Sequence, residues 1–441
     1  INNSKTAVRN YGNLVATTLH INDAYIGLSN SGTASLADLA AQDIDYDVVR
    51  TSGSLNVEVA TFTNVAGGIV SSGTSDVSDL SFYQTGLALK ATSGHLQASG
   101  VSFDGVTVGI ASQAGAVASV ASVIGTNVAL VVDAADSDDL TLDTMVISGH
   151  RLLLANGATH LQAEDITFVG NLNETRAVLD QRCNGICTWN QTTLTNTVWG
   201  VALSGDGDHT FNDLTSESTL RNIDASGNGN LLMSNATLHG SDAALSLRGP
   251  SSIIDGASIT SLSSSAIALD VLDGHHDWND VSVSKTYSSQ DTTSIGLKAW
   301  YSTIVAEGLS IANHGHGIQL SNTNLDGNTM TVVDGKSTGI LLEDSHLDVG
   351  SLTTQVFPTG ALLEGASTLQ ASNWDANLHG TPLMVGSEST ATVRDFQPQN
   401  TQTTSSDALG DGYLLYGGST SATIATSSSD FLEETPVTFT D

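Results

Sequence analysis

The chain of 441 residues is poor in cysteine, proline, aromatic residues and positive charge. It has 2 Cys and 5 Pro, and 13 Lys plus Arg stand against 46 Asp plus Glu, which gives a formal net charge of −33. Such a surface repels a phosphate backbone and an anionic lipid headgroup. We therefore expect no nucleic-acid partner.

Long apolar runs are also missing. No stretch approaches the roughly 18 apolar residues that span a bilayer. The start of the chain has no basic, apolar and small-residue signal, and it begins at Ile1 without Met. We expect no membrane insertion and interpret the chain as a mature or excised portion of a longer protein.

Small and turn-forming residues dominate what remains. The 43 Gly, with abundant Ser, Thr, Asn and Asp, leave few long helix-forming side chains, so the composition favours β structure. Among the acidic residues 36 are Asp and 10 are Glu, and Asp serves both tight turns and Ca²⁺ coordination. No cofactor is required by this composition, although bound Ca²⁺ is compatible with it.

A short motif recurs along the whole chain, consisting of a small residue followed by apolar-x-apolar, as in Val201-x-Leu203 and Ile340-x-Leu342. Successive copies lie about 23 residues apart, and three intervals from Val201 to Ile267 are 22. The first apolar position of each copy falls at residues 26, 48, 69, 87, 110, 128, 152, 177, 201, 223, 245, 267, 295, 318, 340, 361, 382 and 413. A fixed period of this length is typical of a solenoid.

A second strand signature accompanies each copy. It is seen at Leu96 with Val101 and Phe103, and Leu325, Leu347 and Leu369 repeat it at intervals of 22. Alternation within each strand buries one face, and Gly, Asn, Asp or Ser clusters turn the chain between strands. Three short strands and three turns therefore fit one coil.

These patterns predict an all-β protein, a right-handed parallel β-helix of about 18 coils of about 22 residues. We expect the helix over residues 1–400, with a final coil and a tail or linker over 401–441. Over roughly residues 20 to 400 the repeat resembles that of the pectate-lyase-like right-handed parallel β-helix superfamily. The resemblance implies the fold and no activity.

The only cysteines lie in Cys183-Asn184-Gly185-Ile186-Cys187, where Asn-Gly supplies a tight turn. A local disulfide is expected, which fits an oxidising, extracellular or cell-surface location. Sequences of the form Asn-x-Ser/Thr make four asparagines candidates for glycosylation, Asn2, Asn173, Asn190 and Asn235.

The long interval from Ile267 to Ile295 holds a candidate ligand loop, His275, His276, Asp277 and Trp278, with Trp300 and Tyr301 one coil later. Histidine, carboxylate and aromatic groups together could bind a divalent metal or stack on a sugar. A solvated loop with Trp278 folded onto the helix is the simpler interpretation.

Glu343 and Glu364 lie three residues beyond their repeat positions, so stacking places the two carboxylates ~5 Å apart. That separation suits a retaining glycosidase. The same column is expected to hold Arg248, Asp270, Lys298 and Ser321, which makes a charge ladder the simpler explanation.

Two further stretches are similar to features of β-helix enzymes. Gly315-His316-Gly317 is similar to the Gly-His-Gly triplet of polygalacturonases, but their Asn-Thr-Asp and Arg-Ile-Lys are missing, so we interpret the match as coincidence, with His316 in a turn. Pectate lyases need a basic residue beside clustered Ca²⁺ ligands. The densest acidic stretch, a candidate metal site, is Asp133, Asp136, Asp138 and Asp139, and no Lys or Arg lies within it.

The sequence thus favours a structural or adhesive β-helical rod of a cell-surface protein or filament over an enzyme. A polysaccharide hydrolase or lyase and a glycan-binding spike module stay as alternatives. Neither end shows an amphipathic capping helix, so we expect partners to be copies of the chain, adjoining domains of a longer chain, or surface glycans.

Overall fold

The computed structural model describes residues 4–135, 137, 139–240, 242–249, 251–263, 266–286, 292–377, 380–386, 388–399, 413–415, 421–424 and 437–438. Within these ranges the chain is an all-β parallel β-solenoid of about 17 turns of about 22 residues, without a helix. No described segment could therefore cross a bilayer as a helix. The parallel solenoid that the repeat predicted is confirmed, with about one turn fewer than expected.

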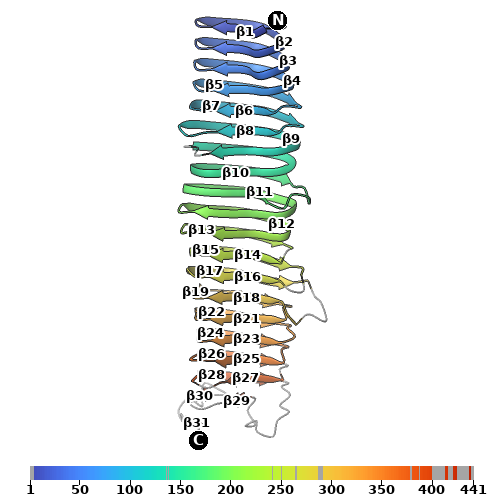
Figure 1. Ribbon diagram of the computed structural model, residues 1–441. Helices are drawn as coiled ribbons and strands as arrows, with labels where there is room; N and C mark the ends of the chain where they lie inside the picture. The colour runs from blue at the N-terminus through green and yellow to red at the C-terminus, as the bar shows by residue number, and fades with distance from the viewer. Residues whose placement is uncertain are drawn as a thin grey trace. The chain divides into compact units, whose positions relative to one another are not determined.

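The chain forms two compact units, unit 1 (Ile1–Ser218) and unit 2 (Thr219–Asp441). The strands of each unit pair in parallel with those of the next turn, as Figure 1 shows. Unit 1 contains β1 (Ser4–Asn10), β2 (Asn13–Asn30), β3 (Thr33–Thr51), β4 (Ser54–Ser71), β5 (Thr74–Tyr83), β6 (Leu87–Ala91), β7 (Gly94–Asp104), β8 (Val108–Ser112), β9 (Ala116–Ala135), β10 (Asp139–Val169), β11 (Ala177–Gly205) and most of β12 (Asp208–Ser226).

Unit 2 begins within β12 and continues with shorter strands. They are β13 (Asn230–His239), β14 (Ala243–Arg248), β15 (Ser251–Ser261), β16 (Ile267–Leu272), β17 (His275–Lys285), β18 (Ile295–Trp300), β19 (Thr303–Ala306), β20 (Leu309–Ala312), β21 (His316–Ser321), β22 (Asn324–Val333), β23 (Thr338–Glu343), β24 (His346–Gln355), β25 (Thr359–Glu364), β26 (Thr368–Asn377), β27 (Thr381–Val385) and β28 (Thr390–Gln399).

Three further strands follow residue 400. β29 (Tyr413–Leu415) pairs in parallel with β27, and β30 (Ser421–Ile424) pairs in parallel with β28. β31 (Val437–Thr438) pairs antiparallel with β30. Parallel pairing thus continues into the segment that was expected to hold the final coil; the other residues from 400 onward lie outside the described ranges.

The chain turns its corners at residues with positive φ, and these residues stack in columns. One column of unit 1 contains Asp23, Asp43 and Asn64, with φ of 50°, 54° and 51°. Asn, Asp and Gly reach this left-handed conformation at the lowest cost, because Gly lacks Cβ and the short polar side chains bond locally. The abundance of Asp in the sequence therefore serves corners, at least in this column.

The interior is built from columns of apolar side chains that repeat once per turn. Leu325, Leu347 and Leu369 are paired in register and fully buried, as their spacing predicted. Phe62 and Phe82 stack in the same way in unit 1, with ring centroids 4.6 Å apart. Each turn thereby covers the apolar face of its neighbours.

The 22-residue spacing predicts that Val201, Ile223, Leu245 and Ile267 stack in one buried column, and this is correct in part. Ile223 pairs with Leu245 and both are buried, but Leu245 pairs with Leu269 and not with Ile267, which is only half-buried. The same two-residue shift places Leu297, not Ile295, in the column. Three alternating apolar residues, Ile267, Leu269 and Val271, made the choice ambiguous, because both Ile267-x-Leu269 and Leu269-x-Val271 fit the motif.

The small residue before the motif has a steric reason. A Cβ on Gly317 would lie 2.2 Å from Val332 Cγ1, and a Cβ on Gly296 would lie 2.2 Å from Ile311 Cγ2. The interior strands approach so closely at these positions that only glycine fits without displacing a neighbour.

A column of buried hydroxyl groups lines one corner of unit 2. Backbone N–H groups of Ser302, Thr323 and Ser345 donate to the hydroxyl of the next turn at 3.2–3.4 Å, and each hydroxyl donates to a backbone carbonyl of its own turn. We call this column the hydroxyl ladder, and its members are Ser302, Thr323, Ser345, Ser367 and Ser389. It satisfies backbone groups that the corner removes from water.

Candidate functional site

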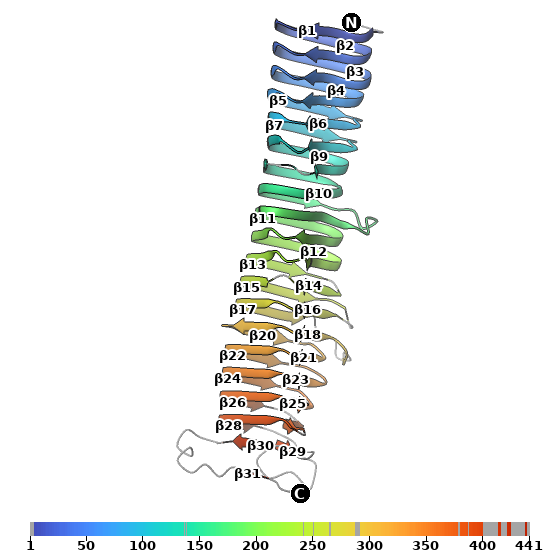
Figure 2. The same ribbon diagram turned by 60° about the vertical axis from the view of Figure 1, so that its left-hand side comes forward.

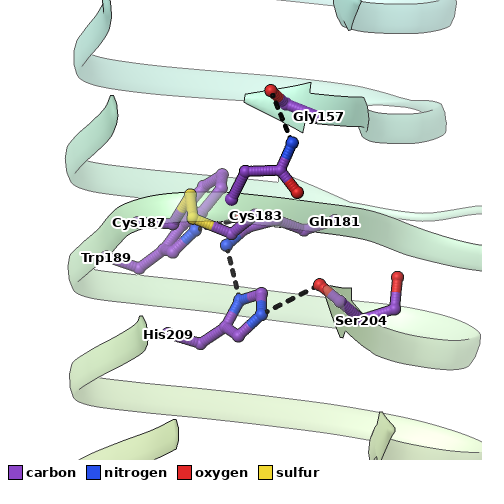
Figure 3. Close-up of a disulfide and its surroundings, with 8 residues drawn as sticks. Gly157, Gln181, Cys183, Cys187, Trp189, Ser204 and His209 are labelled. Carbon is purple, nitrogen blue, oxygen red and sulfur yellow. Dashed lines mark hydrogen bonds between the residues drawn. A yellow bond between two sulfur atoms is a disulfide. The ribbon is translucent and has the colours of Figure 1, made fainter. Parts of the chain in front are cut away.

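The two cysteines form a disulfide in the interior of unit 1, as expected. Cys183 and Cys187 lie on β11 with Cα atoms 6.3 Å apart, and both are fully buried. The side chain of Asn184 between them donates to Gly157 O at 3.5 Å (Figure 3). The bridge therefore closes a tight turn within one strand.

A buried chain of hydrogen bonds runs beside the disulfide (Figure 3). Trp189 Nε1 donates to Gln181 Oε1 at 2.8 Å, and Gln181 Nε2 lies 2.8 Å from His209 Nδ1. His209 Nε2 lies 3.2 Å from Ser204 O. Because an amide nitrogen only donates, His209 must accept at Nδ1 and donate from Nε2, which is the neutral imidazole. Burial lowers the pKa of His209 to about 4.

The candidate ligand loop in unit 2 is not a loop but the first half of β17. His276 and Trp278 point inward and are buried, whereas His275 and Asp277 point outward, with His275 Nε2 3.2 Å from Asp277 Oδ1. Strand alternation sends neighbours to opposite faces, so the four residues cannot converge on one ligand. The prediction of a loop was wrong, because the His, Asp, Gly and Asn composition resembles a turn.

The inward pair repeats the arrangement around His209. Trp278 Nε1 donates to Ser252 Oγ at 3.0 Å, Ser252 Oγ lies 2.9 Å from His276 Nδ1, and His276 Nε2 lies 2.9 Å from Asp273 O. Burial lowers the pKa of His276. Both Trp–His pairs are thus interior polar networks.

The outward charges of unit 2 lie in two neighbouring columns, not in the single one expected. Asp270 pairs with Lys298, whereas Arg248 pairs with Leu272. Glu343 and Glu364 are directly in register on β23 and β25, as predicted, and both are exposed. The hydroxyl of Ser321, one turn before, donates to Glu343 Oε2 at 2.8 Å.

Charges of these columns contact residues of the neighbouring turn or of their own strand. Arg248 lies 3.6 Å from Asp270 Oδ2, and Lys298 Nζ lies 4.1 Å from the centroid of the Trp300 ring. Burial raises the pKa of Asp270, and Arg248 and Lys298 oppose the shift. Arg221 and Asp224 form a further ion pair in the turn before.

The acidic stretch of unit 1 is only partly described. Asp133 is half-buried on β9 and lines a pocket of about 160 Å³ with Lys90. Asp139 opens β10 and pairs with His160 at 3.1 Å. Asp136 and Asp138 lie outside the described residues, and in the described ranges no three His, Cys, Asp or Glu side chains gather as metal ligands would.

The Gly-His-Gly triplet lies at the start of a strand and not in a turn, because β21 begins at His316. His316 is half-buried and His314 is buried. Burial lowers the pKa of His314 to about 4, with a further contribution from Lys285.

The candidate glycosylation sites differ in exposure. Asn173 lies exposed in the loop at 170–176 between β10 and β11, which projects from its turn in Figure 2. Asn235 is an exposed corner residue with φ 51°. Asn190 is half-buried and accepts from Asn212 Nδ2 at 2.8 Å, and Asn2 lies outside the described residues.

Three features were missed at the level of sequence, namely the hydroxyl ladder, the His209 network and the corner occupied by Tyr301. The first had a signal, since Ser or Thr recurs at positions 302, 323, 345, 367 and 389.

No protein family, curated protein or solved structure matches the chain.

Proposed function

We propose that the protein is an extracellular structural or adhesive β-solenoid of a cell surface or filament, and that it does not cleave polysaccharides. The observation that carries this proposal is that outward charges of unit 2 are engaged by residues of the same or the neighbouring turn. The contacts of Arg248 with Asp270 and of Ser321 with Glu343 bridge successive turns, and Lys298 packs on Trp300 of its own strand. Groups used in this way stabilise stacking and are not aimed at one reacting atom.

Two further facts support the extracellular part of the proposal. The disulfide is typical of an oxidising compartment. Exposed Asn173 and Asn235 each begin an Asn-x-Thr sequence in which a glycan has room to attach. The proposal also includes membership of the pectate-lyase-like superfamily. It further includes end-to-end association of copies of the chain.

The alternative is a polysaccharide-cleaving enzyme that uses Glu343 and Glu364. Their register places the carboxylates on successive turns, ~4.8 Å apart along the stack, which is close to the spacing of a retaining pair. Retaining hydrolysis needs one group as acid and the other as nucleophile.

One experiment separates the two functions. The full chain is incubated with acidic and neutral polysaccharides, with and without Ca²⁺, and new reducing ends and unsaturated products are measured. We expect neither product from the wild type. Depolymerisation that disappears in the Glu343→Gln, Glu364→Gln double variant, and persists in the control Glu307→Gln on another exposed corner, would establish the enzyme instead.

A further inference from the structure

Tyr301 occupies a corner position that its neighbours in the column fill with smaller residues. Its φ is 54°, and the equivalent residues of the flanking turns are Asp273, Asn322 and, further along, Asp344 and Gly365. A bulky side chain at positive φ is an outlier, whereas Asn, Asp and Gly are common there. Folding alone therefore gives no reason for a tyrosine at this corner.

The ring of Tyr301 also contributes little to packing. Its exposed fraction is 64%, and no described residue bonds to its hydroxyl or stacks on its ring. The backbone beneath it is well fixed, because the adjacent Ser302 belongs to the hydroxyl ladder and Tyr301 N donates to Ser321 O at 3.2 Å. An unfavourable residue that is held firmly and points to solvent is the pattern of a binding position.

The side chains on either side of the ring supply polar groups of two kinds. Asp273 lies one turn before Tyr301 and Asn322 one turn after it, ~4.8 Å away in each direction, and both are exposed. No described residue bonds to the Asp273 carboxylate or to the Asn322 amide. The first group accepts hydrogen bonds, and the second both donates and accepts them.

We propose that Asp273, Tyr301 and Asn322 bind one sugar unit of a neutral polysaccharide. The aromatic face stacks against the C–H face of the sugar, while the carboxylate and the amide bond to its hydroxyl groups. Acidic sugars are disfavoured, because Asp273, Glu343 and Asp344 surround the corner with negative charge. The inference rests on the adhesive part of the proposed function and names the partner.

The test is affinity electrophoresis of the full chain in native gels that contain a soluble β-glucan, a galactomannan, an arabinoxylan or polygalacturonate. We expect at least one neutral polysaccharide to slow the wild type and polygalacturonate to have no effect. Tyr301→Asn should bind at least tenfold more weakly, and Tyr301→Phe should bind like the wild type because it retains the ring. The matched control is Tyr83→Asn, which removes an exposed ring from β5.

Thermal melting followed by circular dichroism accompanies each variant. Tyr301→Asn should melt at or above the wild-type temperature, because Asn suits the corner conformation. The inference is overturned if no neutral gel slows the wild type, if polygalacturonate slows it most, if Tyr301→Asn binds unchanged, or if Tyr301→Asn melts lower. These binding and melting results are independent of catalysis. Only the appearance of new reducing ends would contradict the non-catalytic proposal.

Discussion

At the scale of single residues, the two buried Trp–His networks differ in how they tolerate a proton. Around His276 the partner is the Ser252 hydroxyl, which can rotate and accept from a protonated ring. Around His209 the partner is an amide whose oxygen is already taken by Trp189, so the amide cannot turn to present an acceptor. Of these two histidines, His209 is therefore the more sensitive to acid.

We predict that unit 1 loses stability as the pH falls from about 6.5 to about 4. The pKa of His209 is lowered to about 4 in the folded chain, so the unfolded chain binds the proton first in this interval. The contribution of neutral His209 to the unfolding free energy is complete at pH values above the pKa of the unfolded chain. It falls as the pH drops below that value, by up to roughly 3 kcal/mol. Urea unfolding at several pH values should show this slope in the wild type.

The variant His209→Asn keeps a donor and an acceptor but does not titrate, so the slope should be reduced. His239→Asn, at an exposed position, serves as the control and should leave the slope unchanged. An equal slope in His209→Asn and the wild type would assign the acid sensitivity to other groups.

At the scale of the strand, register decides which side chains form the core. Leu269 is fully buried in the column of Leu245, whereas Ile267 lies half-exposed at the beginning of β16. We predict that Leu269→Ala destabilises unit 2 by about 2–5 kcal/mol, the usual cost of a cavity left by leucine. Ile267→Ala should cost clearly less, and equal losses in denaturant midpoint would contradict the register.

The hydroxyl ladder makes a second prediction for the same unit. Thr323 Oγ1 accepts from Ser302 N, so Thr323→Val leaves this buried N–H donor without its partner, whereas Ser321 O keeps the hydrogen bond from Tyr301 N. We expect a loss of about 1–3 kcal/mol in unfolding free energy. The control Thr329→Val makes the same substitution at an exposed strand position and should be nearly neutral. A neutral Thr323→Val would show that water satisfies the Ser302 N–H group.

At the scale of the whole molecule, the fold could be predicted because its period is repeated many times. A wrong register at one copy of the repeat, as at Ile267, does not hide the 22-residue spacing of Leu325, Leu347 and Leu369. Individual sites could not be predicted as well. The stretch from His275 to Trp278 looks like a polar loop, and only its alternation shows that His276 and Trp278 face inward. Tyr301 was named only as an aromatic residue one coil beyond the expected ligand loop, because its corner conformation cannot be predicted from one aromatic residue.

The net charge of −33 also acts on the whole molecule. We predict that raising NaCl from about 10 mM to about 150 mM increases the urea midpoint, because salt screens repulsion among exposed carboxylates over a Debye length of ~8 Å. Sucrose at matched osmolality is the control for solvent effects. A midpoint that falls with salt would mean that attractive ion pairs outweigh the repulsion.

The parallel pairing of successive turns has a mechanical consequence. Inter-turn hydrogen bonds point along the stack, as at Asn322 N to Glu343 O, so a pull in that direction loads them in tension. The hydrogen bonds between two adjacent turns share the load, whereas the successive interfaces between the turns of a unit bear it in series. A tether attached through such a unit would yield at its weakest junction and lengthen one turn at a time, absorbing force in small steps while the remaining turns stay folded.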